Sequence, residues 1–213
     1  KLIRDMDLAA EVAHRLLQIN AIKLSPQKPF TWASGIQSPI YCDNRTALSF
    51  PEVRRFIIKG FAQASAIFQP FNVVAGVATA GIPHGALLAE ELGLPFVYVR
   101  SKAKSHGRQN QIEGVLPEGA RVLVIEDLIS TGGSALKAVE ALREANADVV
   151  GVMAIFSYGF DKARTAFEAA GTSFATLSTY DALLKAAAEA EYIAPEEMDT
   201  LEAWRKAPET WGK

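Results

Sequence analysis

Two adjacent carboxylates followed by small residues mark the segment Val122–Ser134, which reads VLVIEDLISTGGS. An apolar run ends in Glu126 and Asp127, and the hydroxyl and glycine residues of 130–134 come directly before an expected helix. Backbone N–H groups at a helix N-terminus are unpaired and attract anions, and glycine lets an anion approach the backbone closely. The segment therefore predicts an anion cradle beside an acidic pair.

Two carboxylates beside an anion site are unexpected, because carboxylates repel a phosphate. A sugar phosphate as the ligand would explain them. Glu126 and Asp127 would accept hydrogen bonds from two ribose hydroxyls and stabilise positive charge that develops on the ring. An ordinary strand-to-helix turn with an acidic start is the plainer alternative, but the complete string favours a sugar-phosphate site.

A nucleoside triphosphatase is not expected from the glycine pattern. The cradle contains no lysine, and Gly76–Gly81 has the G-x-x-x-x-G spacing but is followed by Ile82 and Pro83, not by Lys and Ser or Thr. The small residues of Val77–Pro83 still follow a predicted strand. They would allow close backbone contact with a second anionic group.

Cations gather in the polar segment Arg100–Gly114. They are Arg100, Lys102, Lys104, Arg108 and, when protonated, His106, and no acid occurs before Glu113. A pyrophosphate leaving a sugar is the kind of polyanion that such a loop could stabilise. A solvated basic loop fits this pattern equally well when it is taken alone. The length of 101–119 predicts a mobile lid that closes over substrate.

The composition limits the class of protein and its partners. The 213 residues, of which 49% are hydrophobic and 22% charged, predict one folded domain with at most a small appendage. A net charge of −2 gives no basic excess for nucleic acid, and no apolar run is long enough to span a membrane. The mean hydropathy of +0.09 is high for a monomer and favours oligomerisation.

The cysteine content and the N-terminal residues indicate the compartment. Cys42 is the single cysteine, which excludes an internal disulfide and a cysteine-based zinc cluster. Lys1–Asp7 carry mixed charges and lack the apolar stretch of a signal peptide. We therefore expect a cytoplasmic protein with no nucleic-acid or membrane partner.

Strands and helices alternate after residue 70, and this pattern predicts an α/β fold. The expected strands cover 72–78, 96–100, 121–126, 149–156 and 174–177, and the expected helices cover 83–92, 134–144 and 161–170, with two more closing the chain. Such alternation is typical of a mostly parallel sheet flanked by helices, with ligands at the carboxyl ends of the strands.

The first 50 residues do not join this alternation. A helix near 7–19, capped by Asp7, is expected to precede a hairpin formed by Phe30–Ser34 and Ser38–Asp43. We expect 1–50 to form part of a cap over the core domain 51–213.

The string Glu126–Ser134 resembles the phosphoribosyl-pyrophosphate motif of the type I phosphoribosyltransferases. Similarity to the orotate branch of this family runs in order along the chain, through 34–35, 38–41, 43–45, 77–84, 98–100, 104–107 and 112–114. The resemblance implies the type I phosphoribosyltransferase fold with a small N-terminal cap, or hood. It also implies transfer of the phosphoribosyl group from 5-phosphoribosyl-1-pyrophosphate (PRPP) to orotate in pyrimidine biosynthesis.

The resemblance also implies roles for individual residues and for partners. Lys104, His106 and Asp127 would be catalytic. For orotate, whose contacts in the family are not all matched in this sequence, we expect Arg45 and Ser130 to serve as substitutes. PRPP would be bound by Thr79, Ala80, Arg100, Lys104, His106, Glu126, Asp127, Leu128, Ile129, Ser130, Thr131, Gly132, Gly133 and Ser134. Mg²⁺ would be carried mainly by PRPP, without a dedicated metal site. The protein would be a homodimer whose lid reaches into the neighbouring subunit's site, and a strained peptide bond would lie within 78–80.

Departures from the family pattern leave the pyrimidine contacts open. Some members hold the orotate carboxylate with an arginine after the fifth core strand, whereas 156–159 contain none and Tyr158 is nearest. Many members have a lysine directly after the arginine, where this chain has Ser101. Some have a lysine before the Ser-Gly of the hairpin, where this chain has Ala33. His84 and Cys42 are expected to be packed side chains, with a smaller chance that His84 touches ligand.

Three alternatives to the orotate reaction stay open from the sequence. One is a type I transferase that acts on a purine or on uracil. Another is a non-catalytic protein that senses PRPP, although 1–50 contain no basic recognition helix. The third is a different sugar-phosphate enzyme that shares the cradle but not the lid.

Overall fold

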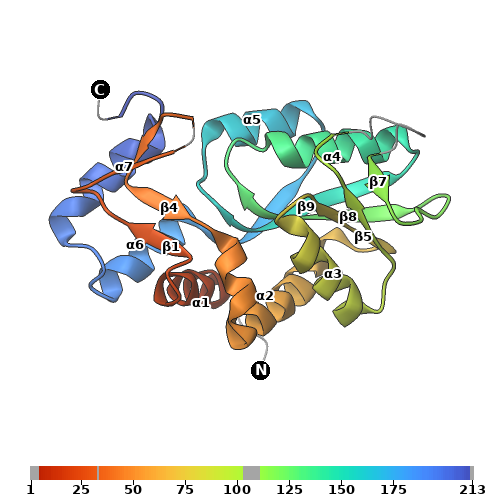
Figure 1. Ribbon diagram of the computed structural model, residues 1–213, viewed down its shortest axis with the longest axis horizontal. Helices are drawn as coiled ribbons and strands as arrows, with labels where there is room; N and C mark the ends of the chain where they lie inside the picture. The colour runs from red at the N-terminus through yellow and green to blue at the C-terminus, as the bar shows by residue number, and fades with distance from the viewer. Residues whose placement is uncertain (1–4, 33, 103–110, 212–213) are drawn as a thin grey trace.

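A six-stranded sheet forms the centre of the computed structural model, which describes residues 5–32, 34–102 and 111–211 (Figure 1). Its strands are β5 (Val73–Val77), β6 (Phe96–Val99), β7 (Ile112–Glu113), β8 (Arg121–Ile129), β9 (Asp148–Ser157) and β10 (Phe174–Thr179). They follow the order β10-β9-β8-β5-β6-β7, and all neighbours are parallel except β7, which runs antiparallel to β6. The mostly parallel sheet predicted from the alternation of strands and helices is confirmed.

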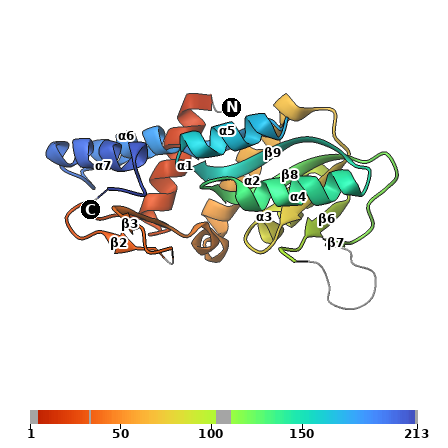
Figure 2. The same cartoon turned by 90° about the horizontal axis from the view of Figure 1, so that it is seen from above.

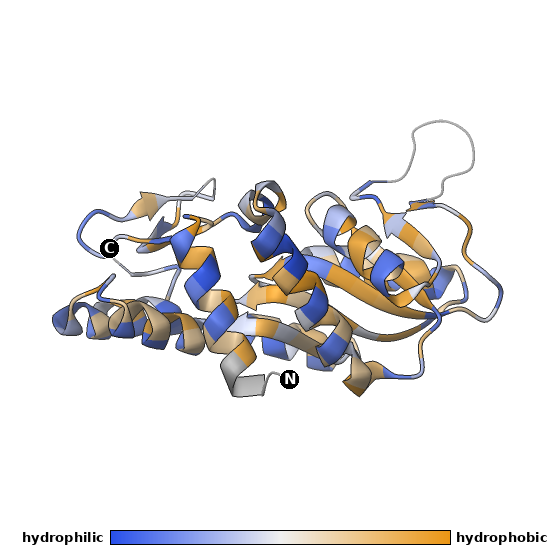
Figure 3. Ribbon diagram, turned by 90° about the horizontal axis from the view of Figure 1, so that it is seen from below, coloured by the Kyte–Doolittle hydropathy of each residue, from blue (hydrophilic) through white to orange (hydrophobic). Residues whose placement is uncertain are grey.

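Helices cover both faces of this sheet (Figure 2). The helices are α1 (Asp5–Gln18), α2 (Pro51–Ala64) and α3 (Gly81–Leu92) on one face, and α4 (Gly133–Glu144) and α5 (Asp161–Ala169) on the other. Alternate residues of β8 divide between the two cores, since Leu123 and Ile125 join the first and Val122 and Val124 the second. Burial on both faces explains why the central strands are continuous apolar runs (Figure 3).

Two small antiparallel sheets make up the N-terminal part. β1 (Ile22–Leu24) pairs with β4 (Ile40–Cys42), and β2 (Phe30–Thr31) pairs with β3 (Gln37–Ser38). The predicted hairpin is therefore present but short. Its second strand is interrupted at Pro39, because proline has no N–H to donate to a strand ladder, and the residues beyond it pair with β1 instead.

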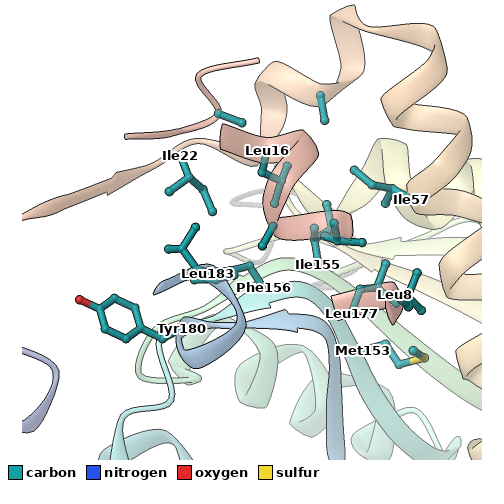
Figure 4. Packing of buried hydrophobic residues seen from close by; sticks show 14 of the residues in the cluster. Leu8, Leu16, Ile22, Ile57, Met153, Ile155, Phe156, Leu177, Tyr180 and Leu183 are labelled. Atoms are coloured by element: carbon teal, nitrogen blue, oxygen red, sulfur yellow. The ribbon is translucent and has the colours of Figure 1, made fainter. Parts of the chain in front are cut away.

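The C-terminal helices lie beside these N-terminal strands (Figure 1). They are α6 (Tyr180–Glu189) and α7 (Met198–Lys206), joined through the short helix η3 (Pro195–Glu197). Trp204 of α7 is fully buried, and its indole N–H donates to the backbone oxygen of Gln37 over 3.2 Å. Figure 4 shows how Leu16 and Ile22 from the N-terminus pack against Leu183 of α6. Both ends of the chain therefore build one lobe.

Several boundaries differ from the prediction by a few residues, and three differences change how a segment is interpreted. Asp7 lies inside α1 and is not its cap, since the helix already includes residue 5. β8 continues to Ile129, three residues past the predicted end, because β9 pairs with it up to Ser157. The predicted lid 101–119 contains the short strand β7, whose Ile112 is buried.

Two short helices complete the described fold. They are η1 (Asn44–Ser49), which connects β4 to α2, and η2 (Ser65–Phe68), which follows α2. Within the described residues, no helix has the length and hydrophobicity that crossing a bilayer requires.

Candidate active site

The predicted cradle lines a cavity of about 320 Å³ at the carboxyl ends of β5 and β8, called here the cradle cavity. Its walls are Ala78, Thr79, Ala80, Glu126, Asp127, Leu128, Ser130, Thr131, Gly132, Gly133 and Ser134. All of the PRPP-binding residues predicted from these two segments are therefore brought together except Ile129. Ile129 is buried in the core cluster beneath α4 and α5.

Two strand ends meet at this cavity because β5 and β8 are direct neighbours, with Gly76 paired to Ile125. The peptide bond between Ala78 and Thr79, inside the predicted segment, is cis. α3 starts at Gly81, where an added Cβ would lie 2.4 Å from the backbone oxygen of Ile125. Only glycine lets the start of α3 approach the backbone of β8 so closely.

Gly132 shapes the opposite wall of the cradle cavity. Its φ of +83° falls in the left-handed region, and an added Cβ would lie 2.7 Å from the ring of Phe167. α4 begins at the next residue, and no side chain caps it. The backbone N–H groups of its first turn are therefore available to an anion, as the cradle prediction requires.

The acidic pair differs from the sequence prediction in one respect. Glu126 is buried, and both of its carboxyl oxygens are used inside the protein. Oε1 accepts the N–H of Asp127 over 3.0 Å, and Oε2 accepts the hydroxyl of Ser134 over 2.9 Å. Asp127 is only partly buried, so it is the more accessible of the two carboxyl groups.

The two carboxyl groups are coupled. Burial, followed by the negative charge of Asp127, raises the pKa of Glu126, and burial also raises the pKa of Asp127. The raised pKa of Glu126, at about 8, favours its protonated form at neutral pH. A pair that holds one proton repels a neighbouring phosphate less than two full charges would.

Asn44 fixes the acidic pair from the N-terminal lobe. Its side chain is fully buried, and Nδ2 donates to the backbone oxygen of Asp127 over 2.9 Å. Asn44 lies in a segment that resembles the family, but its residue type and position alone predict no role for it. Buried amides are almost always hydrogen-bonded, but a motif does not reveal which partner such an amide has.

A second cavity, of about 340 Å³, adjoins the first and is called here the aromatic cavity. It is lined by Thr31, Trp32, Tyr41, Cys42, Leu128, Ser130 and Tyr158. Leu128 and Ser130 line both cavities. No described residue in this lining carries a charged side chain. Its aromatic walls suit a flat ring held next to whatever the cradle binds.

The predicted cations do not line either cavity among the described residues. Arg45 of η1 is exposed, and its guanidinium pairs with Asp43 over 2.7 and 3.0 Å. Arg100 follows β6, and its Nη1 lies 3.6 Å from a carboxyl oxygen of Glu113. Lys104 and His106 lie outside the described residues.

His84 and Cys42, both expected to be packed side chains, are fully buried and half-buried, respectively. His84 of α3 is fully buried and lines neither cavity, and burial lowers its pKa to about 4, so the ring is neutral. The Cys42 thiol lies 3.4 Å from Oδ1 of Asn44, and burial raises its pKa, so it is not a reactive thiolate.

The donor set around the cradle fits a magnesium ion that is held mainly by a substrate. Within 5–32, 34–102 and 111–211 no cluster of three or more His, Cys, Asp or Glu side chains could hold a metal. Mg²⁺ prefers oxygen ligands and is often bound by one or two carboxylates together with phosphates. Glu126 and Asp127 are the carboxyl groups that line the cradle cavity.

Comparison with known proteins places this geometry in a family. The family model described as "Phosphoribosyl transferase domain" matches residues 46–172. The orotate phosphoribosyltransferase of Listeria monocytogenes is 56% identical over 209 residues, covering 98% of this chain and 100% of the relative.

Solved structures agree with this assignment. The crystal structure of orotate phosphoribosyltransferase from Aeropyrum pernix matches with a TM-score of 0.75 and 28% identity, over 86% of this chain and 99% of that one. The Mycobacterium tuberculosis enzyme in complex with PRPP matches with a TM-score of 0.66 and 27% identity, over 84% of this chain and 99% of that one.

The sheet, the acidic pair and the uncapped helix start thus define a phosphoribosyltransferase, the class that the resemblance implied. Within that class, the chain belongs to the orotate phosphoribosyltransferase family.

Proposed function

We propose that this chain transfers the 5-phosphoribosyl group of PRPP to orotate and releases pyrophosphate, giving orotidine 5′-monophosphate for pyrimidine biosynthesis. One observation carries the proposal: the cradle cavity and the aromatic cavity share Leu128 and Ser130. Together they offer an anion site, an acidic pair and a flat neutral pocket in the order phosphate, ribose and base. A nucleoside monophosphate has the same order of parts.

The cradle residues 130–134 would hold the 5-phosphate through backbone N–H groups and hydroxyls. Asp127, with Glu126 behind it, would accept hydrogen bonds from the ribose hydroxyls. When the bond between C1 of the ribose and pyrophosphate breaks, the ring acquires positive charge. The negative charge that the pair retains would stabilise that charge.

The leaving pyrophosphate would be bound by cations and by the loop after β5. Thr79 and Ala80 line the cradle cavity on the side opposite α4 and would contact it. Arg100, Lys104 and His106 are assigned to it by resemblance to the family. Orotate would enter the aromatic cavity, where Ser130 and Arg45 are the proposed contacts. Its N1 would lose its proton to solvent and bond to C1 as the bond from C1 to pyrophosphate breaks, without a covalent enzyme intermediate.

Magnesium is assigned as the cofactor, bound chiefly by the pyrophosphate and ribose oxygens. When bound, it would neutralise negative charge on the leaving group. Glu126 and Asp127 are the residues of this chain that could support it, and Glu126, whose pKa is raised, would have to lose its proton for both to act as ligands.

The wider setting is also part of the proposal. We assign a homodimer in which the lid of one subunit completes the site of the other, with 1–50 as part of the cap and 51–213 as the core. A cytoplasmic location without nucleic-acid or membrane partners fits the charge balance and the single cysteine.

The proposed function is tested by orotate consumption that depends on both PRPP and Mg²⁺. Uracil, adenine, hypoxanthine and xanthine serve as competing acceptors, because a transferase for one of these would prefer it to orotate. Asp127→Asn keeps the shape of the side chain and should lower kcat by roughly 10²–10³-fold. Consumption of a purine or of uracil in preference to orotate would overturn the assignment.

A further inference from the structure

The charge of the aromatic cavity does not match the charge of its proposed occupant. Orotate carries a carboxylate at neutral pH, yet no described side chain that lines this cavity is charged. A charged group that enters a partly buried neutral site must find hydrogen-bond donors there, because it loses its contacts with water. The lining must therefore supply such donors.

Three of the six polar side chains in the lining, those of Trp32, Cys42 and Thr31, already have hydrogen-bond partners within the protein. The indole N–H of Trp32 donates to the backbone oxygen of Ile40 over 3.1 Å. The Cys42 thiol donates to Asn44, and the hydroxyl of Thr31 accepts a hydrogen bond from Gln37 over 2.8 Å. Tyr41 is partly exposed, at 41% of its surface.

Tyr158 differs from the remaining two, Tyr41 and Ser130, because it is almost fully buried and its ring is held in place on several sides. The residue is only 3% exposed, and its ring lies 5.4 Å from that of Trp32, 5.3 Å from Phe160 and 5.6 Å from Trp204, between ring centroids. Aromatic contacts on several sides fix the orientation of a ring. Among the described residues, none hydrogen-bonds to the Tyr158 hydroxyl.

Tyr158 lines the aromatic cavity, which shares Leu128 and Ser130 with the cradle cavity. Burial, then the nearby Cys42 and Asp127, raises the pKa of Tyr158 well above its ordinary value, so the hydroxyl keeps its proton and can donate it. Cys42 lines the aromatic cavity and Asp127 lines the cradle cavity. In orotate the carboxylate is attached to the carbon next to N1, so it lies on the side of the cradle cavity when N1 faces the ribose.

We propose that Tyr158 determines acceptor specificity, because its hydroxyl donates a hydrogen bond to the carboxylate of the pyrimidine acceptor. This inference rests on the proposed function and deepens it. The contact stabilises a pyrimidine with a carboxylate next to its reacting nitrogen, and it gives nothing to a pyrimidine without one. Arg45 at the surface and Tyr158 in the interior then approach the acceptor from different sides.

The test compares two product nucleotides that differ only in the carboxylate, orotidine 5′-monophosphate and uridine 5′-monophosphate. Their binding to the wild type, to Tyr158→Phe and to Tyr180→Phe is measured by titration calorimetry. Tyr180 is the matched control, because it is also fully buried but its hydroxyl donates to the backbone oxygen of Leu201 over 3.0 Å.

Tyr158→Phe should weaken binding of orotidine 5′-monophosphate by roughly 10- to 100-fold, the range for a hydrogen bond to a charged group. Binding of uridine 5′-monophosphate should stay within about twofold, because the phosphate and ribose contacts are intact. Tyr180→Phe should leave the preference for the carboxylated nucleotide unchanged. In steady-state assays, KM for orotate should rise while KM for PRPP does not.

Two results would overturn the inference. One is unchanged binding of orotidine 5′-monophosphate to Tyr158→Phe, and the other is an equal loss for both nucleotides, which would indicate a purely structural role. The proposed function is tested separately by the wild type alone. If the wild type converts orotate while either of these results holds, the role of Tyr158 fails and the proposed function stands.

Discussion

At the scale of single residues, Glu126 and Asp127 form a coupled pair whose two carboxyl groups have different surroundings. Glu126 is enclosed and bonded to the N–H of Asp127 and to Ser134, whereas Asp127 faces the cradle cavity. Ser134 also belongs to the first turn of α4, so the helix start and the acidic pair hold each other in place. A ligand phosphate at this helix start would therefore lie beside a pair whose geometry is already fixed.

The raised pKa of Glu126 predicts a pH dependence of stability. A buried carboxyl that ionises near pH 4.5 when unfolded but at about 8 when folded keeps its proton only in the folded state across that range. The folded protein therefore loses stability as pH rises from about 4.5 to 8, by at most about 1.4 kcal/mol per pH unit. Glu126→Gln cannot ionise, so its stability relative to the wild type should increase over this range.

Urea unfolding of the wild type and of Glu126→Gln at several pH values measures this difference. Glu140→Gln on α4 is a suitable control, because that side chain is exposed and lines neither cavity. A difference between Glu126→Gln and the wild type that does not change with pH would contradict the assigned protonation.

Gly132 gives a second prediction at the residue scale. Gly132→Ala must keep a positive φ and would press against Phe167, so it should lose about 1–3 kcal/mol of unfolding free energy and weaken PRPP binding. Gly133→Ala is the control, since its nearest atom would be 4.0 Å away and its φ is not in the left-handed region. Equal stability of the two variants, measured by thermal unfolding, would argue against this role of Gly132.

Residue types alone predicted the cradle but not the hydrogen bonds within it. Glycines and hydroxyl residues directly before a helix indicate an anion site through local backbone geometry, which a sequence can show. The enclosure of Glu126 depends on how far β8 continues and on where Ser134 comes to lie, and both depend on tertiary pairing. The role suggested here for Tyr158 needed the ring contacts, which connect residues far apart in the chain.

At the scale of elements, the site is built where β5 and β8 end and where α3 and α4 begin. The strand and helix boundaries that mattered were predicted to within a few residues, because buried apolar runs and helix starts are strong signals. β8 is longer than predicted because its partner β9 extends the ladder, which a single strand's sequence does not show. The acidic pair therefore lies within β8, and pairing with β9 holds the backbone before and after it.

The lid is the element that the proposed mechanism depends on most. Lys104→Ala should lower kcat by roughly 10²–10³-fold with a much smaller change in KM for PRPP, because its charge would act on the departing pyrophosphate. Lys102→Ala removes the same charge two residues away and should stay within a few fold. If both variants behave alike in steady-state assays, the loop acts through general charge and not through Lys104.

At the scale of the whole molecule, the two ends of the chain form the lobe that closes the aromatic cavity. Trp204 from α7 contacts Trp32 and Tyr158, both of which line that cavity. The sequence predicted that 1–50 cap the core, but it gave no sign that α6 and α7 join them. That arrangement depends on packing between residues at opposite ends of the chain, which periodicity does not show.

The proposed sharing of sites between subunits predicts complementation. A mixed dimer of one Lys104→Ala chain and one Asp127→Asn chain would contain one intact site and one doubly altered site, if the lid crosses to the partner. Such dimers, purified through two different tags, should recover activity that neither parent dimer has. Absence of recovery in dimers of verified composition would contradict the shared site.

The central claim is that residues 130–134 hold the 5-phosphate while Asp127, supported by Glu126, contacts the ribose. A crystal structure of the protein with PRPP tests it most directly. The claim predicts the 5-phosphate within hydrogen-bonding distance of the backbone N–H groups at the start of α4, and a ribose hydroxyl bonded to Asp127. A 5-phosphate bound elsewhere, with those N–H groups facing no ligand, would contradict it.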